Sequence, residues 1–239
     1  MVESFSGKVA FVTGGTGGLG RVVCSALRDR GATVAIVYLH EEGLSSLPKS
    51  LRSSDDKLLL LKADVTDEQQ VRSAFDQAIA RFGTVDYLLN IAGGYMTRTP
   101  IAELSPEDWD HMMNMNLRSA FLCSREALKI MLKKGSGRII NISAMAGLKP
   151  SGRRGAYAIS KGGVATLTKI CADEVKGSGV TVNAIAPAII ATEANLRSAS
   201  GDEASAWVKP GEIAELMLYL CSDSGRAING AVINIYGGI

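Results

Sequence analysis

The stretch Thr13-Gly14-Gly15-Thr16-Gly17-Gly18-Leu19-Gly20 follows a short apolar run at residues 8–13 and leads into a segment with helical spacing at 19–30. Glycines at a strand-to-helix turn let backbone N–H groups approach a pyrophosphate, and the start of the helix adds partial positive charge. A tight turn also favours glycine for its backbone freedom alone. The evidence for dinucleotide binding is therefore the position of the glycines, directly after a first strand. The stretch predicts a dinucleotide-binding loop.

The rest of the chain alternates between two kinds of segment. Further apolar, β-branched runs lie at 33–38, 57–62, 85–91, 137–142, 180–185 and 231–235. Such continuous runs are typical of parallel strands buried on both faces. Helical spacing is found at 19–30, 68–82, 106–133, 157–175 and 211–222, whereas 193–210 is the least structured stretch and reads as a surface segment over the pocket. The alternation predicts a Rossmann-type, doubly wound α/β fold: a seven-stranded parallel sheet with helices on both faces, in one domain over residues 1–239.

Composition excludes several classes of protein. Of the 239 residues, 46% are apolar and 21% charged, a globular balance that argues against disorder. The net charge is +2 without a basic run, which argues against a nucleic-acid partner. The four cysteines stand singly, which fits neither a metal site nor a disulfide framework. With no signal peptide and no apolar stretch near the roughly 20 residues of a membrane helix, we expect a cytoplasmic protein.

Several motifs follow the glycine stretch in a fixed order. They are Asn90-Ile91-Ala92-Gly93 after the fourth strand, Asn116 in a long helix, Tyr157-Ala158-Ile159-Ser160-Lys161, and Pro187-Ala188 with Thr192 beyond it. With these motifs, the chain resembles the short-chain dehydrogenase/reductase family over about residues 7–238, and overall it looks like the 3-oxoacyl-acyl-carrier-protein reductases of that family. The resemblance implies a hydride transfer between a nicotinamide cofactor and a small carbonyl or hydroxyl substrate.

The resemblance also implies which residues hold the cofactor. They are Gly14, Thr16, Gly17, Gly18, Leu19, Gly20, Tyr38, Asp64, Val65, Asn90, Ala92, Gly93, Tyr157, Lys161, Pro187, Ile190 and Thr192. An acidic residue at the end of the second strand would select NAD, but Tyr38 stands there. Neither Gly17 nor Leu39 is replaced by a basic residue that would favour NADP. The choice between NAD and NADP stays open at this point.

Tyr157 and Lys161 are four residues apart and share one face of a helix. A tyrosine has a pKa of about 10, so proton transfer near neutrality requires a shift of about three units, of which one nearby ammonium supplies about one to three. The resemblance implies that Tyr157 is the acid/base, that Lys161 holds the ribose, and that Asn116 holds a water in a relay to Lys161.

One position departs from the family pattern. The family's catalytic serine lies thirteen residues before the tyrosine, where this chain has Ala144, with Ser143 beside it. Neighbours in extended structure point to opposite faces, although a bulge re-aims a side chain. Losing one oxyanion donor typically costs about 10²–10³ in rate. Either Ser143 takes the place of the catalytic serine, or the reaction of the substrate needs less stabilisation of an oxyanion, or the protein is a weak enzyme.

Two alternative functions remain. Dihydropteridine reductases, in the same broad family, are similar in carrying alanine at the serine position, in the stretch Ala92-Gly93-Gly94-Tyr95, and in a short segment with Trp207 before Pro210. The second alternative is a dinucleotide-binding protein whose catalysis has faded. Arg153 and Arg154 lie in the loop that leads into the Tyr157 helix. They are either a solvated pair or ligands of a substrate carboxylate or phosphate. The resemblance also implies a homo-oligomer, either a homotetramer or a dimer, built on the helices of Asn116 and Tyr157.

Overall fold

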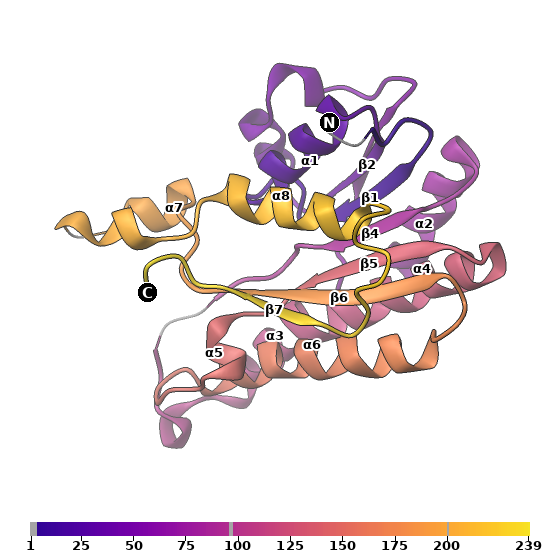
Figure 1. The fold of residues 1–239 in the computed structure, drawn as a ribbon. Helices are drawn as coiled ribbons and strands as arrows, with labels where there is room; N and C mark the ends of the chain where they lie inside the picture. The colour runs from indigo at the N-terminus through magenta and orange to yellow at the C-terminus, as the bar shows by residue number, and fades with distance from the viewer. Residues whose placement is uncertain (1–3, 96–97, 200) are drawn as a thin grey trace.

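The computed structural model describes residues 4–95, 98–199 and 201–239, and its described strands form one parallel sheet. The strand order is β3-β2-β1-β4-β5-β6-β7 (Figure 1). The strands are β1 (Val9–Thr13), β2 (Thr33–Tyr38), β3 (Leu58–Lys62), β4 (Tyr87–Asn90), β5 (Gly137–Ile142), β6 (Val180–Pro187) and β7 (Val232–Ile235). The first and last residues of each strand lie within two residues of the ends of a predicted apolar run. The predicted seven-stranded parallel sheet is confirmed.

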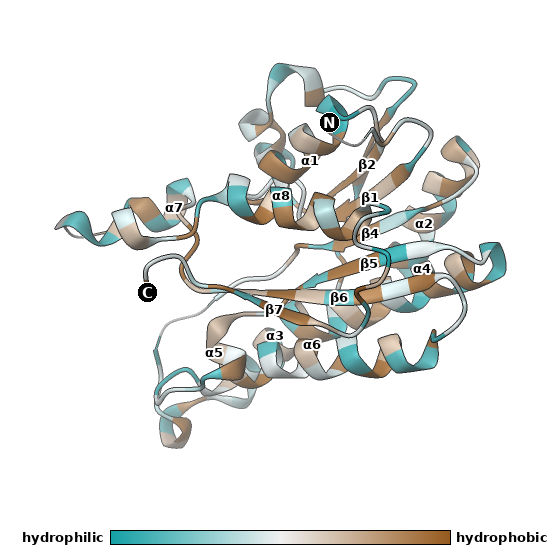
Figure 2. Ribbon diagram, viewed as in Figure 1, coloured by the Kyte–Doolittle hydropathy of each residue, from teal (hydrophilic) through white to brown (hydrophobic). Residues whose placement is uncertain are grey.

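Helices cover both faces of this sheet. On one face, α1 (Gly20–Asp29) and α8 (Pro210–Cys221) bury residues such as Val23, Leu27 and Met217 against the strands. On the other face lie α2 (Glu68–Phe82), α4 (Ser119–Lys134) and α6 (Gly155–Glu174). Figure 2 shows the strands largely in the hydrophobic colour between these two helix layers. Burial on both faces explains why the strands read as continuous apolar runs.

The helix expected at 106–133 is not continuous. The structure has α3 (Pro106–Met112), a π-helical turn η4 (Met113–Arg118) and then α4. The N–H of Ser119 bonds to the carbonyl of Asn114, five residues back, which is the π-helical pattern. Such turns are frequent at functional sites. The turn contains Asn116, which the motif analysis had singled out.

Short helices fill the remaining connections. They are α5 (Met145–Leu148), α7 (Glu193–Leu196), η1 (Glu41–Ser46), η2 (Lys49–Leu51), η3 (Ile101–Glu103) and η5 (Gly201–Ala206). The segment at 193–210, expected to be the least structured, therefore carries two short helical turns, α7 and η5; Ser200 between them lies outside the described residues. Within the described part of the chain, every helix is too short or too polar to span a bilayer.

The chain winds in two directions from the middle of the sheet. It passes from β1 to β2 and β3 on one side, and then returns to add β4 to β7 on the other. β1 and β4 are therefore neighbours whose following segments diverge. In open α/β sheets a crevice forms at the carboxyl ends of the strands at such a point, and ligands bind there. The predicted site residues are found around this crevice.

Candidate active site

The glycine loop between β1 and α1 packs directly against the end of β4. Gly14 has a φ of 63°, and a Cβ at this residue would lie only 2.9 Å from the Cα of Ala92. A Cβ on Gly20 would collide with the carbonyl oxygen of Gly14. Both positions therefore require glycine for packing, and Gly14 requires it for its left-handed backbone conformation as well. The predicted loop residues and Ala92 are brought together.

Side chains on either side of the loop complete a cradle. The Thr13 hydroxyl accepts hydrogen bonds from the N–H groups of Ile91 and Ala92, both at 3.1 Å. On the opposite side, a Cβ on Gly18 would lie 2.8 Å from the Cβ of Thr192. The residue preceding α1, Leu19, supplies no side-chain cap. The loop backbone, flanked by Thr13 and Thr192, thus forms a narrow cradle at the start of a helix, and such a cradle fits the pyrophosphate of a dinucleotide.

The other predicted cofactor residues lie at the same edge of the sheet. Tyr38 ends β2, Pro187 ends β6, and Asp64 with Val65 follows β3. One oxygen of the Asp64 carboxylate accepts hydrogen bonds from the N–H and hydroxyl of Thr66, at 2.8 and 2.7 Å. Two further predicted residues have contacts here. The Ser46 hydroxyl of η1 donates to the Thr16 carbonyl at 2.9 Å, and Ile190 forms an isolated parallel β-bridge with Val208.

The side chain of Asn90 serves the core instead. Its amide donates to Asn141 Oδ1 at 2.8 Å and to the Ser124 hydroxyl at 3.1 Å, and Asn141 in turn donates to Thr168 at 2.9 Å. All four side chains are buried. This network ties β4 to β5 and to the helices behind them. The Nδ2 of Asn90 is therefore committed to the core, whereas its Oδ1 has no hydrogen-bond partner among the described residues, and cofactor binding by Asn90 stays a prediction.

Asn116 is held by the segment that follows β4. Its Oδ1 accepts from the N–H of Gly94 at 3.0 Å, and its Nδ2 donates to the Gly94 carbonyl at 3.1 Å and to the Ser160 hydroxyl at 3.2 Å. Ser160 donates to the carbonyl of Tyr157 at 2.9 Å. The π-helical turn therefore connects the end of β4 to the helix that carries Tyr157. Ser160 was missed as a site residue because a serine within a helix gives no signal of its own.

Lys161 is buried near Asn116. Its Nζ donates to the carbonyl of Ile142 at the end of β5, at 2.9 Å. A Cβ on Gly93 would lie 3.1 Å from that Nζ and 2.6 Å from Asn116 Oδ1. Gly93, Asn116 and Lys161 thus meet at one point. Burial lowers the pKa of Lys161 from 10.5 to about 8, because the charged ammonium loses water.

Tyr157 lies one helical turn before Lys161 and is half-buried. Burial raises the pKa of Tyr157 to about 12, the charge of Arg154 works in the opposite direction, and Tyr95 adds to the increase. The ring of Tyr95 contacts that of Tyr157 edge-on, with 5.0 Å between the ring centres. In this structure burial outweighs the cationic effect expected from the sequence. The phenol therefore keeps its proton at neutral pH and is suited to donate it.

Ser143 does not replace the missing serine. Its side chain is buried, and its hydroxyl donates to the carbonyl of Lys161 at 2.8 Å. The N–H of Ser143 bonds to Ile185, and Ala144 has φ −160° and ψ 156°, so both residues remain extended and no bulge re-aims the hydroxyl. The prediction of Ser143 as a catalytic residue is not supported by this geometry. Position 144 offers only a methyl group.

Comparison with known proteins shows the family to which this chain belongs. A family model for short chain dehydrogenases matches residues 8–203. The chain belongs to the short-chain dehydrogenase family. It is therefore a nicotinamide-dependent oxidoreductase, and the resemblance read from the motifs is confirmed.

Two relatives and one solved structure illustrate how similar this short-chain dehydrogenase is to others. It is 34% identical to cis-4-hydroxycyclohexanecarboxylate dehydrogenase of Sinomonas cyclohexanicum, covering 100% of this chain and 98% of that protein. It is 36% identical to D-threitol dehydrogenase of Mycolicibacterium smegmatis, covering 97% and 92%. The structure of 3-ketoacyl-(acyl-carrier-protein) reductase from Brucella melitensis with NADH superposes with a TM-score of 0.88 at 27% identity, covering 98% and 99%. These three relatives give no support to the dihydropteridine reductase alternative.

Proposed function

We propose that this protein interconverts a small secondary alcohol and its ketone, with Tyr157 as the acid/base. The observation that carries the proposal is the convergence of Gly93, Asn116 and Lys161 one helical turn from Tyr157, beside the glycine cradle. The names of the relatives support an alcohol or carbonyl substrate: one acts on a hydroxycyclohexane carboxylate and another on a sugar alcohol.

Each side chain has a distinct role in this proposal. A bound nicotinamide supplies or accepts the hydride. Tyr157 donates its proton to the carbonyl oxygen during reduction and takes it back during oxidation. Lys161, whose ammonium is aimed at the end of β5, holds the cofactor ribose. Asn116 keeps the segment after β4 in place through its two bonds to Gly94.

The surroundings of the glycine loop favour NAD over NADP. A Cβ on Gly43 of η1 would lie 2.8 Å from Thr16 Oγ1, so η1 packs on the loop. This turn begins with Glu41 and Glu42, and the Lys62 ammonium is already paired with Glu41 at 2.8 Å. A 2′-phosphate here would face excess negative charge. The relative solved with NADH agrees with NAD as the proposed cofactor.

The assembly and the compartment are part of the same proposal. The helices α4 and α6 leave Phe121, Leu132, Ile159 and Ile170 between 43% and 51% exposed. Large apolar side chains in contact with water favour packing of these helices against a second copy, as expected of a dimer or homotetramer. The four cysteines are free and buried, which agrees with a reducing compartment such as the cytoplasm.

A substrate panel tests the function. Oxidation of NADH and NADPH is followed with cyclic ketones, acyclic ketones, quinones and quinonoid dihydropterin. We expect turnover of ketones, with NADH preferred. Binding of NADH without turnover of any compound would favour the alternative in which catalysis has faded. Turnover of dihydropterin alone would favour the pteridine reductase alternative.

A further inference from the structure

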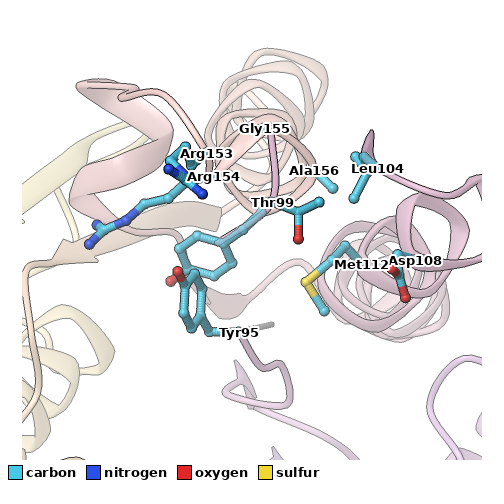
Figure 3. A pocket seen from close by; sticks show the side chains of 10 residues that line it. Tyr95, Thr99, Leu104, Asp108, Met112, Arg153, Arg154, Gly155 and Ala156 are labelled. Atoms are coloured by element: carbon cyan, nitrogen blue, oxygen red, sulfur yellow. The ribbon is translucent and has the colours of Figure 1, made fainter. Parts of the chain in front are cut away.

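A small pocket opens directly beside Tyr157. Its walls come from the segment after β4, from α3 and from the loop that enters α6 (Figure 3). Tyr95, Leu104, Met112 and Ala156 give it an apolar and aromatic lining. A substrate whose oxygen meets the Tyr157 hydroxyl would place its other end in this pocket.

The charged groups of the pocket are separated. Arg153 and Arg154 lie together on one side, whereas Asp108 lies on the opposite side with Met112 (Figure 3). Within the described residues, no ion pair involves Arg153 or Arg154. By contrast, Arg21, Arg28 and Arg30 each pair with a carboxylate. The two guanidinium groups are available to a ligand on their side of the pocket.

Arg154 is positioned relative to the catalytic phenol by contacts. Its guanidinium lies over the Tyr95 ring, 5.9 Å from the ring centre, and that ring contacts Tyr157. Its backbone pairs with Thr99 in an isolated parallel bridge, and the N–H of Thr99 bonds to the Arg153 carbonyl at 2.9 Å. These bonds fix the backbone of the loop, and the face of the Tyr95 ring attracts the guanidinium electrostatically.

Arg153 adopts a backbone conformation that is costly for its residue type. Its φ is 66°, and no other non-glycine residue in the described ranges has a positive φ. Glycine would adopt this conformation without strain, yet the chain has a long cationic side chain here. Strain of this kind is concentrated at ligand-binding positions.

We infer that the substrate carries a carboxylate, bound by Arg154 and Arg153 while its alcohol or ketone group meets Tyr157. This inference rests on the proposed function and adds the substrate class. Two guanidinium groups and the Asp108 carboxylate leave one net positive charge in the pocket. That balance suits a monoanion, whereas a phosphate monoester carries roughly −1.5 to −2 at pH 7. Bidentate pairing with a planar guanidinium also matches carboxylate geometry.

A matched pair of probes tests the inference. Reduction of 4-oxocyclohexanecarboxylate is compared with that of 4-oxocyclohexanecarboxamide, which has the same shape without the charge. The wild-type protein should prefer the carboxylate in kcat/KM. A hydrogen bond to a charged group is worth about 10- to 150-fold in affinity. Arg154→Gln should therefore lower kcat/KM for the carboxylate by about that factor, mainly through a higher KM. The carboxamide should change by less than about threefold, because it has no charge to lose.

Three further variants control for charge and structure. Arg154→Lys keeps the cation and should restore part of the preference. Arg153→Gln should weaken the carboxylate selectively as well, which covers the case in which Arg154→Gln does not fold. Lys57→Gln removes one exposed positive charge far from the pocket and should change neither probe. Equal losses for both probes in Arg154→Gln, or no wild-type preference, would overturn the inference.

Failure of the proposed function is distinguished by binding. Titration calorimetry with the NADH complex measures affinity for the carboxylate without requiring turnover. If neither probe is reduced but the carboxylate binds and Arg154→Gln abolishes binding, the carboxylate site stands and the reaction is wrong. If ketones without charge are reduced and the carboxylate neither binds nor reacts better, the reaction stands and the carboxylate site is wrong. If no ketone is reduced and the carboxylate does not bind, both the proposed reaction and the carboxylate site are wrong.

Discussion

The hydroxyl of Ser143 donates a 2.8 Å hydrogen bond to the main-chain carbonyl of Lys161. This bond fastens the segment after β5 to the helix that carries Tyr157 and Lys161. It also commits the hydroxyl of Ser143, the neighbour of Ala144, to the core. We therefore propose that Ser143 positions the helix, and that position 144, an alanine, lacks the oxyanion donor usual in the family.

Replacing Ser143 by alanine should lower stability without disabling catalysis. Loss of a buried hydrogen bond costs about 1 kcal/mol, which for a chain of this size lowers Tm by about 2–4 °C. Because the hydroxyl does not face the pocket, kcat should stay within about threefold of wild type. Thermal denaturation and steady-state kinetics measure the two effects. A loss of activity near 100-fold at unchanged Tm would show that Ser143 is catalytic after all.

Replacing Ala144 by serine should raise the rate with simple ketones. A donor at this position stabilises the developing oxyanion, an effect typically worth about 10²–10³. A new hydroxyl in a site shaped around a methyl group should recover part of it, so we expect a kcat gain of about 10-fold. Ala146→Ser is the matched control, since it adds a hydroxyl to another buried alanine nearby. Equal kcat for all three proteins would contradict the oxyanion argument.

Lys161→Met should stabilise the cofactor-free protein. A pKa lowered from 10.5 to about 8 means that the folded state disfavours the charged ammonium by about 3 kcal/mol. Below pH 8 the wild type carries this whole cost, and its stability should rise as the pH increases from about 8 to about 10.5, because the unfolded chain then binds more protons. Urea denaturation at pH 7 and pH 10 measures the difference. The stabilising effect of Lys161→Met should be about 3 kcal/mol at pH 7 and should fall below about 1 kcal/mol at pH 10, and an effect independent of pH would argue against burial as its cause.

Leu39→Arg should improve the use of NADPH. Leu39 follows β2 directly and is 47% exposed, so the substitution removes little packing. An added cation offsets the negative charge of Glu41 and Glu42 toward a 2′-phosphate, and a charge-assisted hydrogen bond is worth about 10-fold or more. The ratio of kcat/KM for NADPH and NADH measures the change. Leu39→Gln is the neutral control, and an equal improvement in that variant would rule out charge as the reason.

The sequence predicted the sheet better than the site. Strands buried on both faces leave unbroken apolar runs, so their ends were placed within two residues, and α2 was placed at its observed bounds of Glu68–Phe82. The sequence does not predict the π-helical turn at Asn116, whose side chain bonds to Gly94, twenty-two residues away in the chain. The same holds for Ser143 and Asn90, since a polar residue at the end of a strand faces either the pocket or the core. Only the packing of the helices decides which.

The central claim is that the Tyr157 hydroxyl transfers the proton. Tyr157→Phe removes that hydroxyl and keeps the ring contact with Tyr95. The decisive measurement is kcat for ketone reduction by this variant together with its dissociation constant for NADH. We predict that kcat falls by about 10³ or more while cofactor affinity stays within about twofold, because a general acid typically contributes about 10²–10⁴. A variant that binds NADH normally and retains kcat within tenfold of wild type would contradict the account.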